Sequence, residues 1–330
     1  MQTNLNSFFN KSNKIYNVFC INWDEDYPKT YWDFCKPPEY NFNKTIKWKK
    51  IGIDINLIGN IENNTVKMTE NYKYTSLLKS NIQKCIRRGL VNQSISTAKL
   101  MIKTDFIQFL RRIFIIILED TTLHSSVCPI MWMTAAYPEW QPCQKHINWL
   151  LGLVKYLAES SYRDIYLKSD YDFINNIEKI NKLPINDRNI IYCLYFRTSY
   201  GGMKGDIGMI NYLINVWINR FINKNYYHVY DNFILLDYKP KNIKINQILI
   251  ESVDFHCYPK IIDLIKRKYI DLDKEDIKKS IWYYSSSYNF RNIIDGSIID
   301  FEIEKKKYFN IWAKIQEDVK KYSKSYLKNL

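Results

Sequence analysis

The chain has 330 residues, a formal net charge of +14 and 46% hydrophobic residues, enough apolar surface for a packed core. Its densest apolar run, residues 113–118, is too short to span a membrane, and the N-terminus has no apolar signal core, so we expect neither a membrane span nor export. Seven cysteines without a C-x-x-C pair argue against a zinc ribbon or a disulfide framework and predict reduced, buried thiols.

The positive charge has two possible explanations. Lys and Arg outnumber Asp and Glu by 48 to 34, which favours association with a polyanion such as nucleic acid. The chain is also crowded with Lys, Asn, Ile and Tyr but has only nine Gly and nine Pro, the bias that an AT-rich genome imposes on any protein. Such a genome would belong to a virus, a plasmid or an unusual microbe.

Residues 1–75 are predicted to be irregular with some strand. Residues 16–23 (YNVFCINW) are aromatic and β-branched, which is typical of a strand. Residues 44–50 (KTIKWKK) have two interpretations. They follow a phosphate backbone with Trp48 stacking on bases, or they form a solvated edge strand with one anchored aromatic.

Residues 76–170 are predicted to be helical. A first helix runs through the Arg87–Arg88 pair and stops at Gly89, and a fourth covers residues 146–158 with an apolar stripe. The residues expected to cap the first three helices are Ser80, Ser94 or Ser96, and Asp105.

Residues 171–330 are predicted to be helical with minor strands. A helical pair at 186–222 precedes alternating, strand-like residues at 229–254, and the remainder returns to helix. The last helix has a heptad seam, which either pairs with a partner helix or packs on its own domain: Tyr308, Trp312, Ile315, Val319, Tyr322 and Tyr326. The predicted fold class is therefore mainly α with a minor β component.

Residues 81–120 resemble the C-terminal helical oligomerisation region of the RarA/MgsA family, whose eukaryotic relative is the Werner-helicase-interacting ATPase. The match begins with NIQKCIRRG and extends loosely to about residue 160. The matching positions are Lys84, Arg87, Ala98, Asp105, Arg111, Arg112, Glu119 and Asp120. The resemblance implies a helical region like the collar of a clamp loader, self-association, and a link to DNA replication or repair.

In this family the charged pairs serve helix packing and subunit association. The resemblance therefore assigns scaffold or oligomerisation roles to Arg87, Arg111, Arg112, Glu119 and Asp120. Only about 80 residues precede the matching region, and the chain has no G-x-x-x-x-G-K-[ST] loop, so the family's ATPase module is not expected here.

Four of the nine glycines fall within residues 201–208. Their backbone amides, with Arg197 and Lys204, form either an anion-binding nest or a tight turn between helices, in which Asp206 caps the second helix. The residues assigned to phosphate binding in the first interpretation are Arg197, Gly201, Gly202, Lys204 and Gly205.

Residues 282–291 combine hydroxyl groups, an amide and an arginine with aromatic rings, a set that suits phosphates and stacked bases. The alternative is a helix break in which the serines cap backbone groups. The candidate binding residues here are Ser285, Ser286, Ser287, Asn289 and Arg291. Asp254 and His256 form an Asp–His dyad or half of a metal site, or His256 is a buried histidine that orients a turn.

Three functions remain open. The first is a non-catalytic, oligomerising, nucleic-acid-associated protein that maintains a viral or other AT-rich genome, with a replication or repair partner. The second is an enzyme on a phosphate-bearing or nucleic-acid substrate, with a site built from 197–208, 254–257 and 285–291. The third is a viral structural or assembly protein. We expect no cofactor, no metal and no recognisable catalytic residue, and a cytoplasmic, nuclear or viral-factory location.

Overall fold

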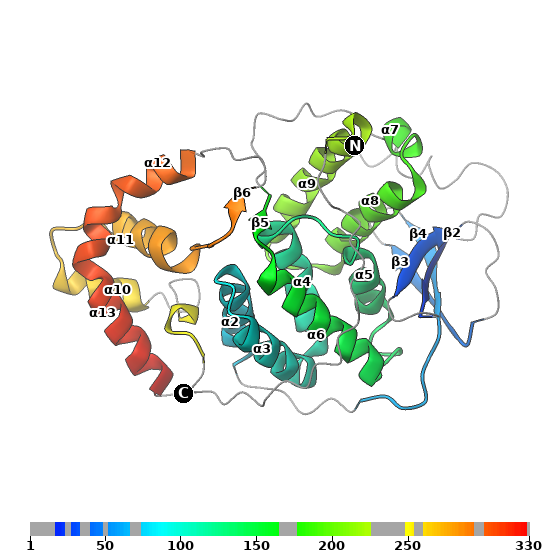
Figure 1. Cartoon of the computed structure of the whole chain (residues 1–330), viewed down its shortest axis with the longest axis horizontal. Helices are drawn as coiled ribbons and strands as arrows, with labels where there is room; N and C mark the ends of the chain where they lie inside the picture. The colour runs from blue at the N-terminus through cyan, green and yellow to red at the C-terminus, as the bar shows by residue number, and fades with distance from the viewer. Residues whose placement is uncertain are drawn as a thin grey trace. The chain divides into compact units, whose positions relative to one another are not determined.

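The computed structural model describes residues 17–23, 28–33, 40–48, 52–66, 74–164, 177–225, 248–253, 260–293 and 300–328 (Figure 1). The fold is mainly helical with a small sheet, as predicted. Within these residues no helix is long and apolar enough to cross a bilayer.

Contacts divide the chain into two compact units. Unit 1 comprises residues 1–66, 114–149 and 164–236, and unit 2 comprises residues 67–113, 150–163 and 237–330. Each unit draws on all three of the consecutive segments predicted above.

Unit 1 contains a four-stranded sheet with the order β2-β1-β4-β3. Its strands are β1 (Val18–Asn22), β2 (Lys29–Asp33), β3 (Phe42–Trp48) and β4 (Ile53–Gly59). β1 confirms the strand predicted at 16–23; it pairs parallel to β4 and antiparallel to β2. β3 pairs antiparallel with β4 at the sheet's edge, which agrees with the edge-strand interpretation of residues 44–50.

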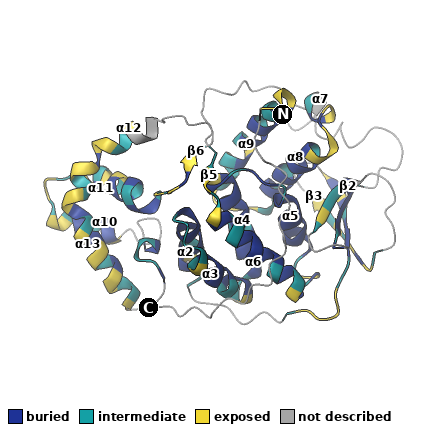
Figure 2. Ribbon diagram, viewed as in Figure 1, coloured by how far each residue is buried: buried dark blue, intermediate teal, exposed yellow. Residues whose placement is uncertain are grey.

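Aromatic rings form much of the core of unit 1. Phe19 stacks on Trp32 with ring centroids 4.3 Å apart. Helix α5 (Val127–Ala136) is buried on every side (Figure 2), and its Trp132 donates a hydrogen bond of 2.9 Å from Nε1 to the Phe19 carbonyl. A helix that is apolar all round must lie inside a core, and here it packs against the sheet.

The helical pair predicted at 186–222 is confirmed. Unit 1 contains the short helix α7 (Ile177–Asn181), then α8 (Ile185–Arg197), the 3₁₀ turn η2 (Thr198–Tyr200) and α9 (Lys204–Asn223). The predicted helix at 146–158 is α6 (Gln144–Glu159), which contributes residues to both units, as does α4 (Phe106–Asp120).

The first helices of unit 2 begin earlier than predicted. α2 (Thr75–Arg87) starts before Ser80, and Ser94 and Ser96 lie inside α3 (Val91–Thr104), where their hydroxyls donate to the carbonyls of Leu90 and Asn92. Such back-bonding lets serine sit within a helix. The Asp105 cap is confirmed, since its Oδ1 accepts from the Gln108 amide at 3.2 Å.

Gly89 ends α2 as predicted. Its φ is +66°, a left-handed conformation that favours glycine. The amide of Leu90 donates to the Cys85 carbonyl at 2.9 Å and that of Gly89 to the Ile86 carbonyl at 3.1 Å. These two bonds form a Schellman motif, which satisfies the last carbonyls of the helix.

The C-terminal part of unit 2 is helical, and its elements are the 3₁₀ turn η4 (Ile250–Ser252), α10 (Lys260–Lys268), α11 (Lys274–Ile281), the π-helical turn η5 (Trp282–Ser286), α12 (Asp300–Lys307) and α13 (Phe309–Lys328). The strand-like stretch predicted at 229–254 is wrong near its end, because residues 250–252 form η4. Residues 229–247 and residue 254 lie outside the described residues. Two short strands, β5 (Tyr162–Arg163) and β6 (Asn292–Ile293), pair in parallel.

The heptad seam of α13 packs on its own unit. Tyr308, Ile315 and Val319 are buried, and α13 contacts α10, α11 and η4. Asn81 joins η4 to the first helices, since its Oδ1 accepts from the Leu249 amide at 2.9 Å while its Nδ2 donates to Thr97. The cysteines within the described residues are buried, as predicted, and none of them is in a disulfide.

Candidate functional site

The glycine-rich segment 201–208 is the turn between α8 and α9 in unit 1. Gly201 and Gly202 have φ of +68° and +141°, which explains why two glycines stand there. Arg197 is only 2% exposed, and its Nη1 donates to the Gly201 carbonyl at 2.7 Å. The guanidinium thus stabilises the turn from inside, an arrangement that agrees with the turn interpretation rather than with an open nest.

The remaining residues of this segment belong to α9. Lys204 is its first residue, and Asp206 lies in its first turn rather than at the N-cap, which is Met203. A carboxylate in the first turn interacts favourably with the positive end of the helix dipole. Gly205 and Gly208 face open space.

Arg291 is also used internally, in unit 2. It is 4% exposed, its Nε donates to the Ser160 carbonyl at 2.9 Å, and its Nη2 donates to the Leu157 carbonyl. It therefore caps the C-terminal end of α6, where a cation and a donor are both favourable. Asn289 supports it, because its Oδ1 accepts from the Arg291 amide.

Ser285 and Ser286 of η5 are buried, Ser287 at its end is half-buried, and arginine side chains contact the backbone of the first two. Arg87 Nη1 donates to the Ser286 carbonyl at 2.9 Å, and Arg88 Nη2 donates to the Ser285 carbonyl. The hydroxyl of Ser287 donates to the Trp282 carbonyl at 2.6 Å. The Ser287 bond agrees with the helix-break interpretation, and the two arginine bonds join the end of α2 to η5.

The break itself is a π-helical turn. The Ser287 amide donates to the Trp282 carbonyl at 2.8 Å, five residues earlier. π-Turns are rare and occur frequently at functional sites. The turn is followed by Tyr288, which is 45% exposed.

The five residues to which the RarA-like resemblance assigns scaffold roles lie on α2 and α4. Arg87 is fixed by Ser286, and Arg112 donates to Gln83 Oε1 at 3.1 Å within unit 2. Arg111 is half-buried, Glu119 is exposed and Asp120 is buried. The bonds of Arg87 and Arg112 connect helices, which is compatible with a scaffold role. The Asp254–His256 pair lies outside the described residues.

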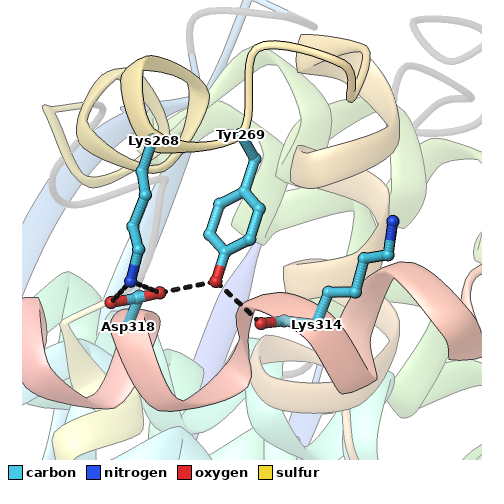
Figure 3. Close-up of polar contacts among 4 residues, drawn as sticks. All are labelled: Lys268, Tyr269, Lys314 and Asp318. Atoms are coloured by element: carbon cyan, nitrogen blue, oxygen red, sulfur yellow. Dashed lines mark hydrogen bonds and ion pairs between the residues drawn. The ribbon is translucent and has the colours of Figure 1, made fainter.

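A polar cluster fixes α13 to the end of α10 (Figure 3). Lys268 Nζ lies 2.8 and 2.7 Å from the two carboxylate oxygens of Asp318. The Tyr269 hydroxyl lies 2.7 Å from Asp318 Oδ2 and 3.0 Å from the Lys314 carbonyl, so its single proton can bond either oxygen. Hydrogen bonds from Lys268 and Tyr269 lower the pKa of the Asp318 carboxyl. The cluster orients α13.

The C-terminal half of α13 has a basic face that the sequence reasoning did not single out. Beyond Asp318 the chain has four lysines and no Asp or Glu. An open groove of about 450 Å³ follows this face and is lined by Glu317, Lys320, Lys321, Lys324, Ser325 and Lys328. All four lysines are exposed. Lysines in a last turn also complement the helix dipole, but that effect ends within a turn, and this row is longer.

A smaller pocket of about 280 Å³ shares Lys320 with the groove. Its charged lining residues are Arg88, Glu251 and Lys320, and its aromatic ones are Tyr284, Tyr288 and Trp312. These side chains come from four separate stretches of unit 2. Two features of the sequence pointed to this site. No acidic residue follows Asp318, and Trp312 lies on the heptad seam of the same lysine-rich helix.

Within the described residues no group of three His, Cys, Asp or Glu side chains could hold a metal ion. No protein-family model, curated protein or solved structure matches the chain. The resemblance to the RarA/MgsA family therefore stays a prediction from the sequence.

Proposed function

We propose that this is a non-catalytic, nucleic-acid-associated protein that binds phosphates through the basic face of α13. The observation that supports this most is the row of Lys320, Lys321, Lys324 and Lys328, which repeats at helical spacing along one groove. Lysines arranged in this way neutralise successive phosphates and release counterions.

Competition from nearby carboxylates is weak on this face. Glu317 Oε1 lies 3.2 Å from Lys320 Nζ, but Glu317 is 81% exposed, and such an exposed pair contributes little. A phosphate can therefore replace Glu317 at Lys320. The RarA-like residues on α2 and α4 extend the proposal to self-association and to replication or repair, with a partner protein in that process and an intracellular location.

The test is a salt titration of binding to fluorescent single- and double-stranded DNA and RNA, with light scattering on the same samples. Replacing Lys320, Lys321, Lys324 and Lys328 by Gln should lower the affinity for every probe. It should also reduce the slope of log K against log salt on duplex DNA by roughly 0.9 for each lysine in contact.

A matched variant controls for net charge. Replacing four lysines that lie outside the basic face by Gln removes the same charge from elsewhere in the chain: Lys44, Lys155, Lys274 and Lys278. We expect this variant to keep the salt slope of the parent. Equal losses in both variants, or no binding near physiological salt, would contradict the proposal.

A further inference from the structure

The pocket beside the basic face has a composition that a phosphate-binding groove does not require. Three aromatic rings line it, and Arg88 and Glu251 place opposite charges within it. Its volume of about 280 Å³ lies just below the range for small-ligand pockets, roughly 300–1,000 Å³. It fits one planar group rather than a folded segment of a protein.

The aromatic walls are held in place by their neighbours. The rings of Tyr284 and Trp312 are 11° from parallel with centroids 6.1 Å apart. The Tyr284 hydroxyl donates to the Lys305 carbonyl at 2.9 Å, which fixes the ring. Trp312 is half-buried, so it keeps apolar surface for a ligand. Since each base has a π-face, rings of this kind stack on bases without regard to sequence.

The charged walls of the pocket carry both signs, since Arg88 and Lys320 are cationic and Glu251 is anionic. Arg88 donates to the carbonyls of Lys84 and Ser285, and its guanidinium lies 5.8 Å from the centroid of the Tyr288 ring. Burial lowers the pKa of Arg88, while the Glu251 carboxylate opposes that shift. A carboxylate repels phosphate but accepts from the N–H groups of a base, and an arginine donates to base oxygens and ring nitrogens.

We infer that this pocket receives one unpaired nucleobase while the flanking phosphates lie along Lys320 and the basic face of α13. The inference rests on the proposed function and specifies its ligand as nucleic acid with a single-stranded segment. A base in a continuous duplex is stacked and paired, so entering the pocket would require it to be unpaired first. The protein should therefore bind a single strand more tightly than a duplex of the same length.

The test compares three fluorescent DNA probes of equal length at one salt concentration: a single strand, a duplex, and a single strand with several abasic sites. We expect the single strand to bind roughly tenfold more tightly than the abasic strand, because stacking of one base contributes about that much. Tyr288→Ala and Trp312→Leu should remove this advantage while leaving duplex affinity and its salt slope unchanged.

Tyr162→Ala is the matched control, because Tyr162 is 50% exposed, close to the 45% of Tyr288, and does not line the pocket. Tyr288→Ala is informative even if Trp312→Leu fails to fold. Equal affinity for normal and abasic strands would overturn the inference and leave the proposed function intact if binding stays salt-dependent. Absence of binding to all probes would overturn both. A Tyr288→Ala variant that loses self-association in light scattering but keeps its affinity would overturn the inference by assigning the pocket to a protein contact.

Discussion

A tryptophan stands among lysines twice in this chain, in β3 of unit 1 and in α13 of unit 2. Trp48 of β3 is 2% exposed and packs against Phe196 with ring centroids 4.9 Å apart, and Lys44 of the same strand is paired with Glu139 at 2.6 Å. Trp312 of α13 is half-buried, and the lysines that follow it are exposed. The same residue types thus stabilise a core in one unit and line a pocket in the other.

The largest expected effect is on Trp48. Trp48→Ala should lower the free energy of unfolding by about 3–5 kcal/mol, because it leaves a cavity beside Phe196 and Trp32. Trp312→Leu should lower it by clearly less. Urea unfolding of both variants measures the difference. Equal losses would break the comparison, since Trp312 would then be as much a core residue as Trp48.

Acid should destabilise unit 1 through His146. Its Nδ1 accepts from the Cys143 amide at 2.9 Å, and its ring lies 4.4 Å from that of Trp23. Burial lowers the pKa of His146 to about 3, with Lys145 adding to the effect. In the unfolded chain the pKa is about 6.5, so between these values the unfolded state binds the extra proton and stability falls as pH falls.

The free energy of unfolding should fall by about 1.4 kcal/mol per pH unit, or roughly 2 kcal/mol between pH 6.5 and pH 5. His146→Asn keeps an acceptor for the Cys143 amide but does not titrate, so its stability should change less with pH over this window. Unfolding curves at pH 5, 6 and 7 provide the measurement. Parallel pH profiles for parent and variant would show that His146 is not the titrating group.

The elements of the fold could be predicted from the sequence better than the site. Gly89 and Asp105 marked helix ends correctly because their backbone requirements are local. The helix start predicted at Ser94 or Ser96 was wrong, because a serine can either cap a helix or bond back to a carbonyl within it. The packing of neighbouring residues decides between the two. The pocket was not predictable, because Arg88, Glu251, Tyr288 and Trp312 are brought together only by the packing of α13 and η4 in unit 2.

The same dependence on distant residues explains where the structure places two of the candidate arginines. Arg197 and Arg291 were candidates for phosphate binding because each stands beside glycine, serine or asparagine residues. In the structure each donates to backbone carbonyls from a buried position. The sequence carries the chemical type of a side chain, but its exposure depends on distant residues. The lysines after Asp318 could have been recognised, because the last part of the chain has four lysines and no Asp or Glu among them.

The smallest expected effects separate the glycines of 201–208. Gly201 has φ of +68° and ψ of −172°, a region occupied almost only by glycine, so Gly201→Ala should lower the free energy of unfolding by about 1–3 kcal/mol. Gly205 and Gly208 lie in α9, and a methyl group at either position would meet no heavy atom within 4 Å. Gly208→Ala should therefore raise the free energy of unfolding by up to about 1 kcal/mol, because alanine has the higher helix propensity.

Opposite signs for Gly201→Ala and Gly208→Ala in urea unfolding would identify the segment as a turn built for α8 and α9. If the glycine amides instead formed an anion-binding nest, phosphate would stabilise the parent more than Gly201→Ala. Unfolding with and without phosphate tests this directly. An equal response in parent and variant leaves Gly201 a purely structural residue, and it confines phosphate binding in the proposal to the lysines of α13.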